Sequence, residues 1–155
     1  MVRVCVYYIA KNTKDLSDTL CEEQIGLVNY FGVKLGFVNL MSKGIKEAQR
    51  QNQSESQEIY TKEFLKVFRE KDYKISLSPN GKKVDSIKFA NYLKDKSDIS
   101  FFIGGAYGLS YDFIQKCDEN LSLSDLTFSH KIAKIILSEQ IYRGFCILNN
   151  HPYHK

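Results

Sequence analysis

Hydrophobic and polar residues alternate along this chain with the periods of strands and helices in turn. Short apolar runs rich in β-branched and aromatic residues predict strands. They occupy residues 2–9, 33–40, 73–78 and 99–103, with a last strand and its loop at 121–128. The first run is apolar almost throughout, which is typical of a strand buried on both faces.

Segments with helical periodicity lie between these runs. The predicted helices cover residues 15–31, the second half of 41–72, a short stretch from Asp85 or Ser86, a short stretch from Ser110 to Asp118, and residues 130–148. Gly32 provides a C-terminal stop. Ser54 or Ser56 is the expected N-cap of the second of these helices. Alternation of strands and helices predicts an α/β fold with a mostly parallel sheet, in one domain spanning residues 1–155.

The early part of the 41–72 segment is polar and has no sustained apolar face. It is expected to be exposed, mobile, or both. It carries Lys43, Lys46 and Arg50, which could reach RNA phosphates. A solvated loop and helix face explains the same residues equally well.

Composition narrows the class of protein. The chain has 155 residues, 43% of them hydrophobic, which suits one domain with a sizeable core. No apolar run approaches the ~20 residues that cross a bilayer, so no membrane partner is expected. The four cysteines form no CxxC pair, and only Cys146 and His151 have a spacing that weakly resembles zinc ligands. We therefore expect reduced, buried thiols in the cytoplasm and no metal. A net charge of +4 permits an anionic partner such as RNA without establishing one.

Two loops carry the candidate binding chemistry. The IGGAYG turn at residues 103–108 follows a strand, and its glycines let the backbone approach a ligand closely. A tight turn without a ligand is the alternative. The loop LSLSDLTFSH at residues 121–130 holds more hydroxyl groups than helix capping requires. Together the two loops make a nucleotide-type cofactor site plausible at the carboxyl ends of the strands.

The last helix and the tail are the other candidates. Apolar residues lie on more than one face of residues 130–148, which predicts either a subunit interface or a central core helix. Arg143 lies among them and needs an anionic partner, either a phosphate or a carboxylate. The tail NNHPYHK could contact nucleotides through its histidines and tyrosine, or could simply be frayed.

Taken in order, IGGAYG, LSLSDLTFSH, EQIYRGF and NHPYHK resemble the RlmH family of SPOUT-class methyltransferases over the full length. The resemblance implies a SPOUT-type sheet flanked by helices with a C-terminal trefoil knot, and a homodimer. It also implies transfer of a methyl group from S-adenosylmethionine to N3 of a pseudouridine in large-subunit rRNA, on assembled ribosomes. The alternatives are a SPOUT enzyme for tRNA or another rRNA site, and a non-catalytic RNA-binding module.

The same resemblance assigns residues to the two sides of the reaction. The cofactor-binding positions are Leu77, Gly105, Ser124, Asp125, Leu126, Thr127, Phe128 and Ser129. The substrate-side positions are Arg143, Tyr153 and His154. In this assignment Arg143 holds the nucleotide or a phosphate, Tyr153 stacks on or bonds to the base, and His154 removes the N3 proton or orients the base.

Overall fold

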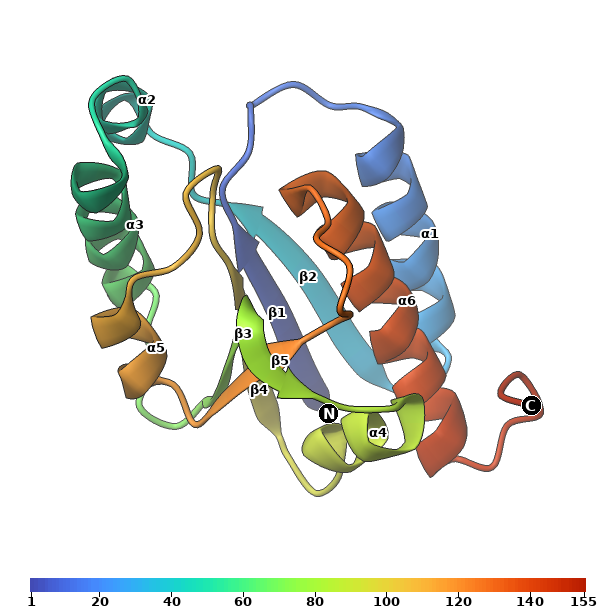
Figure 1. The fold of residues 1–155 in the computed structure, drawn as a ribbon. Coiled ribbons are helices and arrows are strands. Elements are labelled where there is room, and N and C mark those ends of the chain that lie inside the picture. Colours follow the sequence, from blue (N-terminus) through green and yellow to red (C-terminus); the bar gives the residue numbers. More distant parts are fainter.

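A five-stranded parallel sheet forms the centre of the computed structural model, which describes residues 1–155 (Figure 1). The strand order is β2-β1-β4-β3-β5, and every neighbouring pair is parallel. The strands are β1 (Val2–Tyr8), β2 (Val33–Asn39), β3 (Tyr73–Lys83), β4 (Asp98–Ile103) and β5 (Glu119–Ser122). The predicted mostly parallel α/β sheet is therefore confirmed.

Six helices cover the two faces of the sheet. They are α1 (Leu16–Asn29), α2 (Lys43–Gln49), α3 (Gln53–Lys66), α4 (Ser86–Leu93), α5 (Tyr111–Lys116) and α6 (His130–Leu148). Helices α1, α4 and α6 lie on one face, and α2, α3 and α5 lie on the other (Figure 1). None of the six has both the length and the apolar character needed to cross a membrane.

Each face of the sheet has its own apolar cluster. Along β1, Val4 and Val6 point into the larger cluster under α1, α4 and α6, whereas Cys5 and Tyr7 point into the smaller one. The smaller cluster joins aromatic side chains of α3, β4 and α5. Because successive strand residues alternate between faces, a run that is apolar throughout can fill both clusters.

Most of the predicted helix ends agree with the structure. Asp85 caps α4 and Ser110 caps α5, each accepting a hydrogen bond from a backbone N–H of the first turn. Gly32 follows α1 with φ +70°, a conformation that favours glycine. The predicted cap of α3 is wrong: the cap is Asn52, whose Oδ1 accepts from the Glu55 amide at 2.9 Å. Ser54 lies within the helix, as does Ser56, which is fully buried.

The polar segment after β2 is more ordered than its composition predicts. Its residues form α2 and the first half of α3. Ile45 and Ala48 are buried, and they are enough to anchor α2 on the sheet, with Ser42 as its N-cap. Lys43, Lys46 and Arg50 are exposed, as predicted.

Strand β3 does not end at Ser78, as the Pro79-Asn80-Gly81 sequence predicts. Leu77 and Lys82 both pair with Leu121, so the residues between them bulge out of the strand. Gly81 is required there, because a Cβ would lie 2.6 Å from the Leu121 carbonyl oxygen. The last strand is also displaced: β5 covers Glu119–Ser122, and residues 123–128 form only the loop.

Arg3 links the amino ends of β1 and β4. Its Nε donates to Asp98 at 2.7 Å and its Nη2 to the buried Asp72 at 2.6 Å. The hydrogen bond from Arg3 lowers the pKa of Asp98 to about 2. Because the ordinary aspartate pKa is about 3.9, the bond stabilises the fold above about pH 4.

The Arg3–Asp98 contribution is expected to be lost as the pH falls from about 4 to about 2. The Asp98→Asn variant should therefore show a flatter dependence of unfolding free energy on pH across that range than the wild type. Denaturant unfolding followed by circular dichroism at several acidic pH values measures the difference. Parallel curves for the two proteins would contradict this assignment.

Candidate functional site

A pocket opens where β3, β4 and β5 end, at the carboxyl edge of the sheet. Its volume is about 220 Å³. Leu77 to Pro79 of the β3 bulge, the glycine turn after β4 and the hydroxyl loop after β5 supply most of its wall, and the first turn of α6 closes it. Of the predicted cofactor positions, the pocket is lined by Leu77, Gly105, Ser124, Leu126, Thr127 and Phe128.

The glycine turn has no room for a Cβ at Gly104 or at Gly105. A Cβ on Gly104 would lie 2.6 Å from the backbone of Gly108, and Gly108 itself has φ +71°. A Cβ on Gly105 would lie 2.6 Å from the hydroxyl oxygen of the fully buried Tyr60. The turn is closed by a hydrogen bond from the Gly108 amide to the Gly105 carbonyl at 3.0 Å. Backbone groups therefore form this wall of the pocket.

The hydroxyl loop is shaped by its own hydrogen bonds. Ser122 Oγ donates to the Ser124 carbonyl at 2.9 Å, and the Leu126 amide donates to Ser124 Oγ at 3.0 Å. Two predicted positions lie outside the pocket lining. Asp125 is exposed and pairs with Lys83, and Ser129 caps α6 by accepting from the Ile132 amide at 3.3 Å.

His130 stands at the start of α6 and lines the pocket. Burial lowers the pKa of His130, and the positive charges of Lys131 and Lys134 act in the same direction. With a pKa below its ordinary value of about 6.5, the imidazole is mostly neutral near pH 7. The pocket therefore accepts a positively charged ligand without repulsion from this residue.

The three predicted substrate-side residues meet at the other end of α6. Arg143 Nη1 lies 3.3 Å from His154 Nδ1, and its guanidinium stacks over the Tyr153 ring at 4.7 Å. Sequence reasoning missed Glu139, which joins them. Its Oε1 accepts from Arg143 Nη2 at 2.6 Å and from Tyr153 Oη at 3.0 Å.

Glu139 is the carboxylate partner that Arg143 needs, and its hydrogen bond raises the pKa of the guanidinium. The spacing of four residues between Glu139 and Arg143 is the signal that could have identified the pair. The contact also assigns a tautomer to His154. A guanidinium can only donate, so His154 Nδ1 accepts, and its Nε2 carries the proton.

Within one chain, the pocket and the Arg143 cluster do not meet. His130 and Arg143 are thirteen residues apart on a continuous helix. At 1.5 Å per residue they are separated by about 20 Å along the axis. Reacting atoms must approach to about 3–3.5 Å. The pocket and the Arg143 cluster of the same subunit therefore cannot both contact the reacting atoms of one site.

Comparison with known proteins decides the family. A family model described as "Predicted SPOUT methyltransferase" matches residues 2–154. The chain belongs to the SPOUT methyltransferase family. Proteins named "Ribosomal RNA large subunit methyltransferase H" are similar over the full length: 40% identical in Aliarcobacter butzleri, 43% in Wolinella succinogenes and 44% in Campylobacter jejuni subsp. doylei. Each comparison covers 99% of this chain and 100% of the relative, so the resemblance stated from the motifs is confirmed.

A solved structure supports the SPOUT fold. It is described as a probable methylase family protein from Haemophilus influenzae Rd KW20. The TM-score is 0.53 at 14% identity, and the match covers 99% of this chain and 70% of that chain. At this level of identity the likeness concerns the fold.

A SPOUT methyltransferase requires a methyl donor, and the pocket at the carboxyl edge fits one. Leu77, Ile103 and Phe128 give it apolar walls, while Ser124 and Thr127 bring hydroxyl groups to the lining. The glycine turn adds backbone groups that no side chain covers. Apolar walls with a few placed polar groups are typical of cofactor sites, as is this edge of a parallel sheet.

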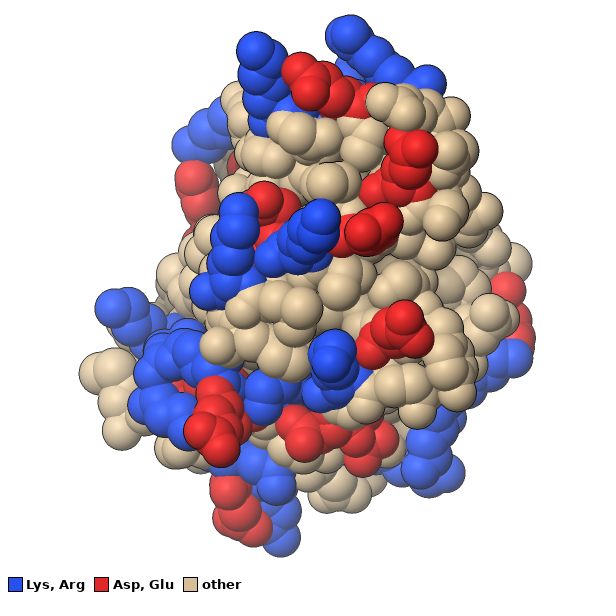
Figure 2. All heavy atoms as spheres, turned by 90° about the vertical axis from the view of Figure 1, so that its left-hand side faces the viewer, with Lys and Arg blue, Asp and Glu red and all other residues tan.

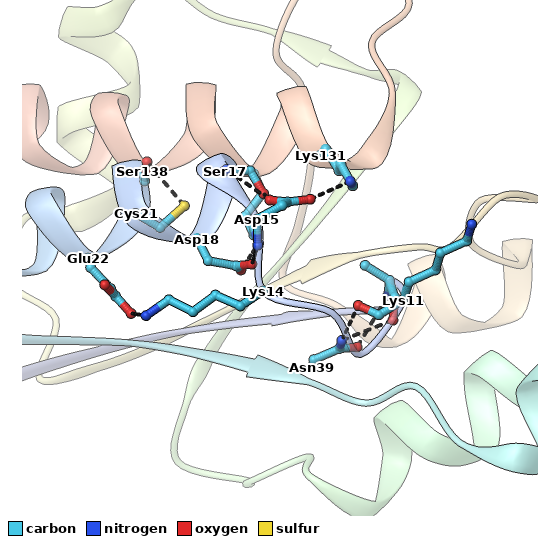
Figure 3. Close-up of polar contacts among 12 residues, drawn as sticks. Lys11, Lys14, Asp15, Ser17, Asp18, Cys21, Glu22, Asn39, Lys131 and Ser138 are labelled. Carbon is cyan, nitrogen blue, oxygen red and sulfur yellow. Dashed lines mark hydrogen bonds and ion pairs between the residues drawn. The ribbon is translucent and has the colours of Figure 1, made fainter.

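A second hollow of the SPOUT domain is larger, about 410 Å³, and lies where β1 and β2 end beside α1 and α6 (Figure 3). It is lined by four lysines, and three of them have a carboxylate partner. Lys14 pairs with Glu22, Lys131 with Asp15, and Lys134 with Asp18, whereas Lys11 at its edge is unpaired. Most of these charges are neutralised, so the hollow is a weaker candidate for an anionic ligand than its lysines suggest.

The Lys134–Asp18 pair joins α6 to α1 at 2.8 Å. The Lys134 side chain is 4% exposed and also lies over the Tyr8 ring at 4.3 Å. Burial alone would lower the pKa of Lys134, but the hydrogen bond to Asp18 and neighbouring negative charge outweigh it, so its pKa is raised. The pair therefore keeps a buried ammonium charged.

Asp18→Asn is expected to destabilise the fold by about 3 kcal/mol, because Lys134 would keep a buried charge without a carboxylate. Denaturant unfolding measures the change. Glu22→Gln is the matched control: its pair with Lys14 is exposed, so its loss should cost no more than ~1 kcal/mol. Equal losses of unfolding free energy in the two variants would show that burial of the lysine does not make its carboxylate partner more important.

Proposed function

We propose that this protein transfers the methyl group of S-adenosylmethionine to N3 of a pseudouridine in large-subunit rRNA, on assembled ribosomes in the cytoplasm. The observation that carries the proposal is similarity over the full length to relatives named ribosomal RNA large subunit methyltransferase H, at 40–44% identity. The pocket at the carboxyl edge of the sheet supports it, since its lining suits a nucleoside with a cationic group.

The donor side of the reaction is assigned to this pocket. S-adenosylmethionine, when bound, supplies an electrophilic methyl group on a sulfonium centre. Leu77 and Phe128 would contact the apolar faces of the donor, and the backbone at Gly105 would bond to its polar edge. Residues 124–129 would close over it, with Asp125 and Ser129 acting from outside the lining to hold that loop. Placement and removal of water account for most of the rate enhancement.

The substrate side is assigned to Arg143, Tyr153 and His154. N3 of pseudouridine lies between two carbonyl groups. In the proposed step its proton passes to solvent water as N3 takes the methyl group, and the negative charge that develops lies on the two carbonyl oxygens. Arg143 and the Nε2–H of His154 can donate to these oxygens, because the Arg143 contact leaves His154 Nδ1 as the acceptor. Of the two roles considered for His154, this arrangement favours orienting the base over removing the proton. Tyr153 would stack on the nucleotide.

A homodimer brings the two sides together in this proposal. The donor pocket of one subunit would be completed by the Arg143 cluster of the other, because about 20 Å separates them within a chain. An exposed apolar face on α1 and α6 supports an interface. Leu16 is 82% exposed and Tyr30 79% exposed, and Leu20 and Ile132 are also exposed. A C2 dimer would bury this face and form two equal sites.

Methyl transfer from labelled S-adenosylmethionine tests the function. Ribosomes that carry the pseudouridine are compared with matched ribosomes that carry uridine at that position. Label on the first sample alone is expected. Label on both would retain a methyltransferase but reject the dependence on pseudouridine.

Two further substrates test which form of RNA the enzyme requires. Free rRNA with the same pseudouridine should be a poor substrate, because a domain of 155 residues has little surface for reading RNA and depends on the shape of the ribosome. Equal labelling of free rRNA would reject action on assembled ribosomes. Label on tRNA instead would place the activity in another branch of the SPOUT enzymes.

A further inference from the structure

Four exposed cations gather at the carboxyl edge of the sheet, and we call them the basic rim. Lys43, Lys46 and Arg50 belong to α2 and its C-cap, and Lys11 lies in the loop after β1. The side chain of Asn39 donates hydrogen bonds to backbone carbonyl groups of this loop. Because Asn39 lies only two residues before Met41, these bonds keep the loop close to the start of α2. The rim is thus built from two neighbouring strand ends.

None of the rim cations has a carboxylate within 4 Å, unlike many other cations on the same side of the molecule. On that side Lys62, Lys66 and Arg69 each pair with an acidic residue. Figure 2 shows basic side chains projecting from the upper end, where Figure 1 places α2, with an acidic side chain between them, and mixed charges lower down. Glu47 is the one acidic residue on α2. The rim therefore keeps an excess of positive charge that its own chain does not satisfy.

The rim is connected to the donor pocket. Tyr107 of the glycine turn donates from Oη to the Gln49 carbonyl at 3.4 Å, at the C-terminal end of α2. Gln49 Nε2 donates to Tyr60 Oη at 2.5 Å, and that oxygen is the atom against which Gly105 packs. Helix α2 and the pocket wall are thus fixed to one another. Anything bound along the rim is placed next to the pocket mouth.

We propose that the basic rim binds backbone phosphates of the rRNA that flanks the methylated nucleotide. The inference rests on the proposed function, because it takes rRNA as the substrate, and it adds the surface that the RNA contacts. Unpaired, exposed lysine and arginine side chains are suited to phosphate contacts that position a nucleic acid without reading its sequence. In the hollow beside α1, three of the four lysines are held in ion pairs, and the fourth, Lys11, belongs to the rim.

The test compares two triple variants with equal loss of charge. The rim variant is Lys43→Gln, Lys46→Gln and Arg50→Gln. The control variant is Lys34→Gln, Lys88→Gln and Lys94→Gln, three exposed cations without carboxylate partners. Lys34 is the second residue of β2, and Lys88 and Lys94 belong to α4 and its C-cap, at the end of the molecule opposite α2 (Figure 1). Binding to ribosomes is measured for each protein over a fourfold range of monovalent salt.

Removal of three phosphate contacts should reduce the slope of log affinity against log salt by about 2–3. Across a fourfold rise in salt, the wild type should then lose about 15–65-fold more affinity than the rim variant loses. The control variant should keep the wild-type slope. Unchanged thermal unfolding and S-adenosylmethionine binding show that the rim variant is folded.

The outcomes separate this inference from the proposed function. A rim variant with the wild-type slope and affinity, or a control variant with the same loss, overturns the inference. Methylation by the wild type is measured in parallel. Binding that depends on the rim without methylation would reject the proposed function and keep the inference, whereas absence of any ribosome binding would reject both.

Discussion

The Arg143→Ala variant is expected to methylate ribosomes about 10²–10³-fold more slowly than the wild type, at saturating donor and ribosome. Arg143 holds His154 and Tyr153 in place and is itself a donor toward the developing charge on the base. Binding of S-adenosylmethionine should be unchanged, because Arg143 lies outside the pocket lining. Single-turnover methylation and donor titration measure the two quantities separately.

Arg143→Lys is the matched control for this prediction. Lysine keeps the positive charge but loses the planar fork that contacts Glu139 and His154 together. The Arg143→Lys variant should recover little of the methylation rate if orientation of the side chain matters, and most of that rate if charge alone matters. A normal rate in Arg143→Ala would exclude the residue from the reaction.

Mixing two inactive dimers is expected to restore methyl transfer. One parent is Arg143→Ala, and the other is Gly105→Leu, whose side chain would collide with Tyr60 and displace the glycine turn that forms a wall of the donor pocket. After exchange of subunits, half of the dimers are mixed, and each has one intact site of its two. About a quarter of the wild-type activity should therefore return.

The mixing experiment needs a pocket variant that folds. Ala133 lines the pocket, so the larger side chain of Ala133→Phe would occupy it. This variant replaces Gly105→Leu if Gly105→Leu unfolds at a lower temperature than the wild type. Two Arg143→Ala preparations mixed together provide the blank. A mixture that stays inactive although the subunits exchange would show that each subunit completes its own site.

Much of the fold could be predicted because the local sequence patterns agree with the packing of the folded chain. The run at β1 is apolar except for Arg3, and the structure buries residues 4–8 between the two faces. Asp85 and Ser110 cap their helices through contacts that lie within one turn of the chain. The confirmed parallel sheet follows from the alternation of such segments.

The errors arose where a distant partner determines the local structure. Gly81 looks like a turn residue, but its neighbourhood is set by Leu121, forty residues further along. Helix α2 has only Ile45 and Ala48 on its buried side, too few to give an apolar period in the sequence. The C-terminal trefoil knot, implied by the family resemblance, stays a prediction.

For the candidate site too, some features could be predicted from the sequence and others could not. Strand-end reasoning located the glycine turn and the hydroxyl loop, which the structure brings together in one pocket. Glu139 was missed because a single acid on a helix carries no signal until its partner four residues later is considered. The distance between Arg143 and the pocket follows from the continuous helix at residues 130–148, which the sequence predicted and the structure confirms.

The continuity of α6 makes it a spacer of fixed length. Its first turn lines the donor pocket, and its last turns carry Glu139 and Arg143. One residue inserted between these ends would move the second by 1.5 Å and turn it by about 100° around the axis. Sequence changes between the two ends can therefore be accommodated as substitutions, whereas insertions and deletions there would move the Arg143 cluster relative to the donor pocket.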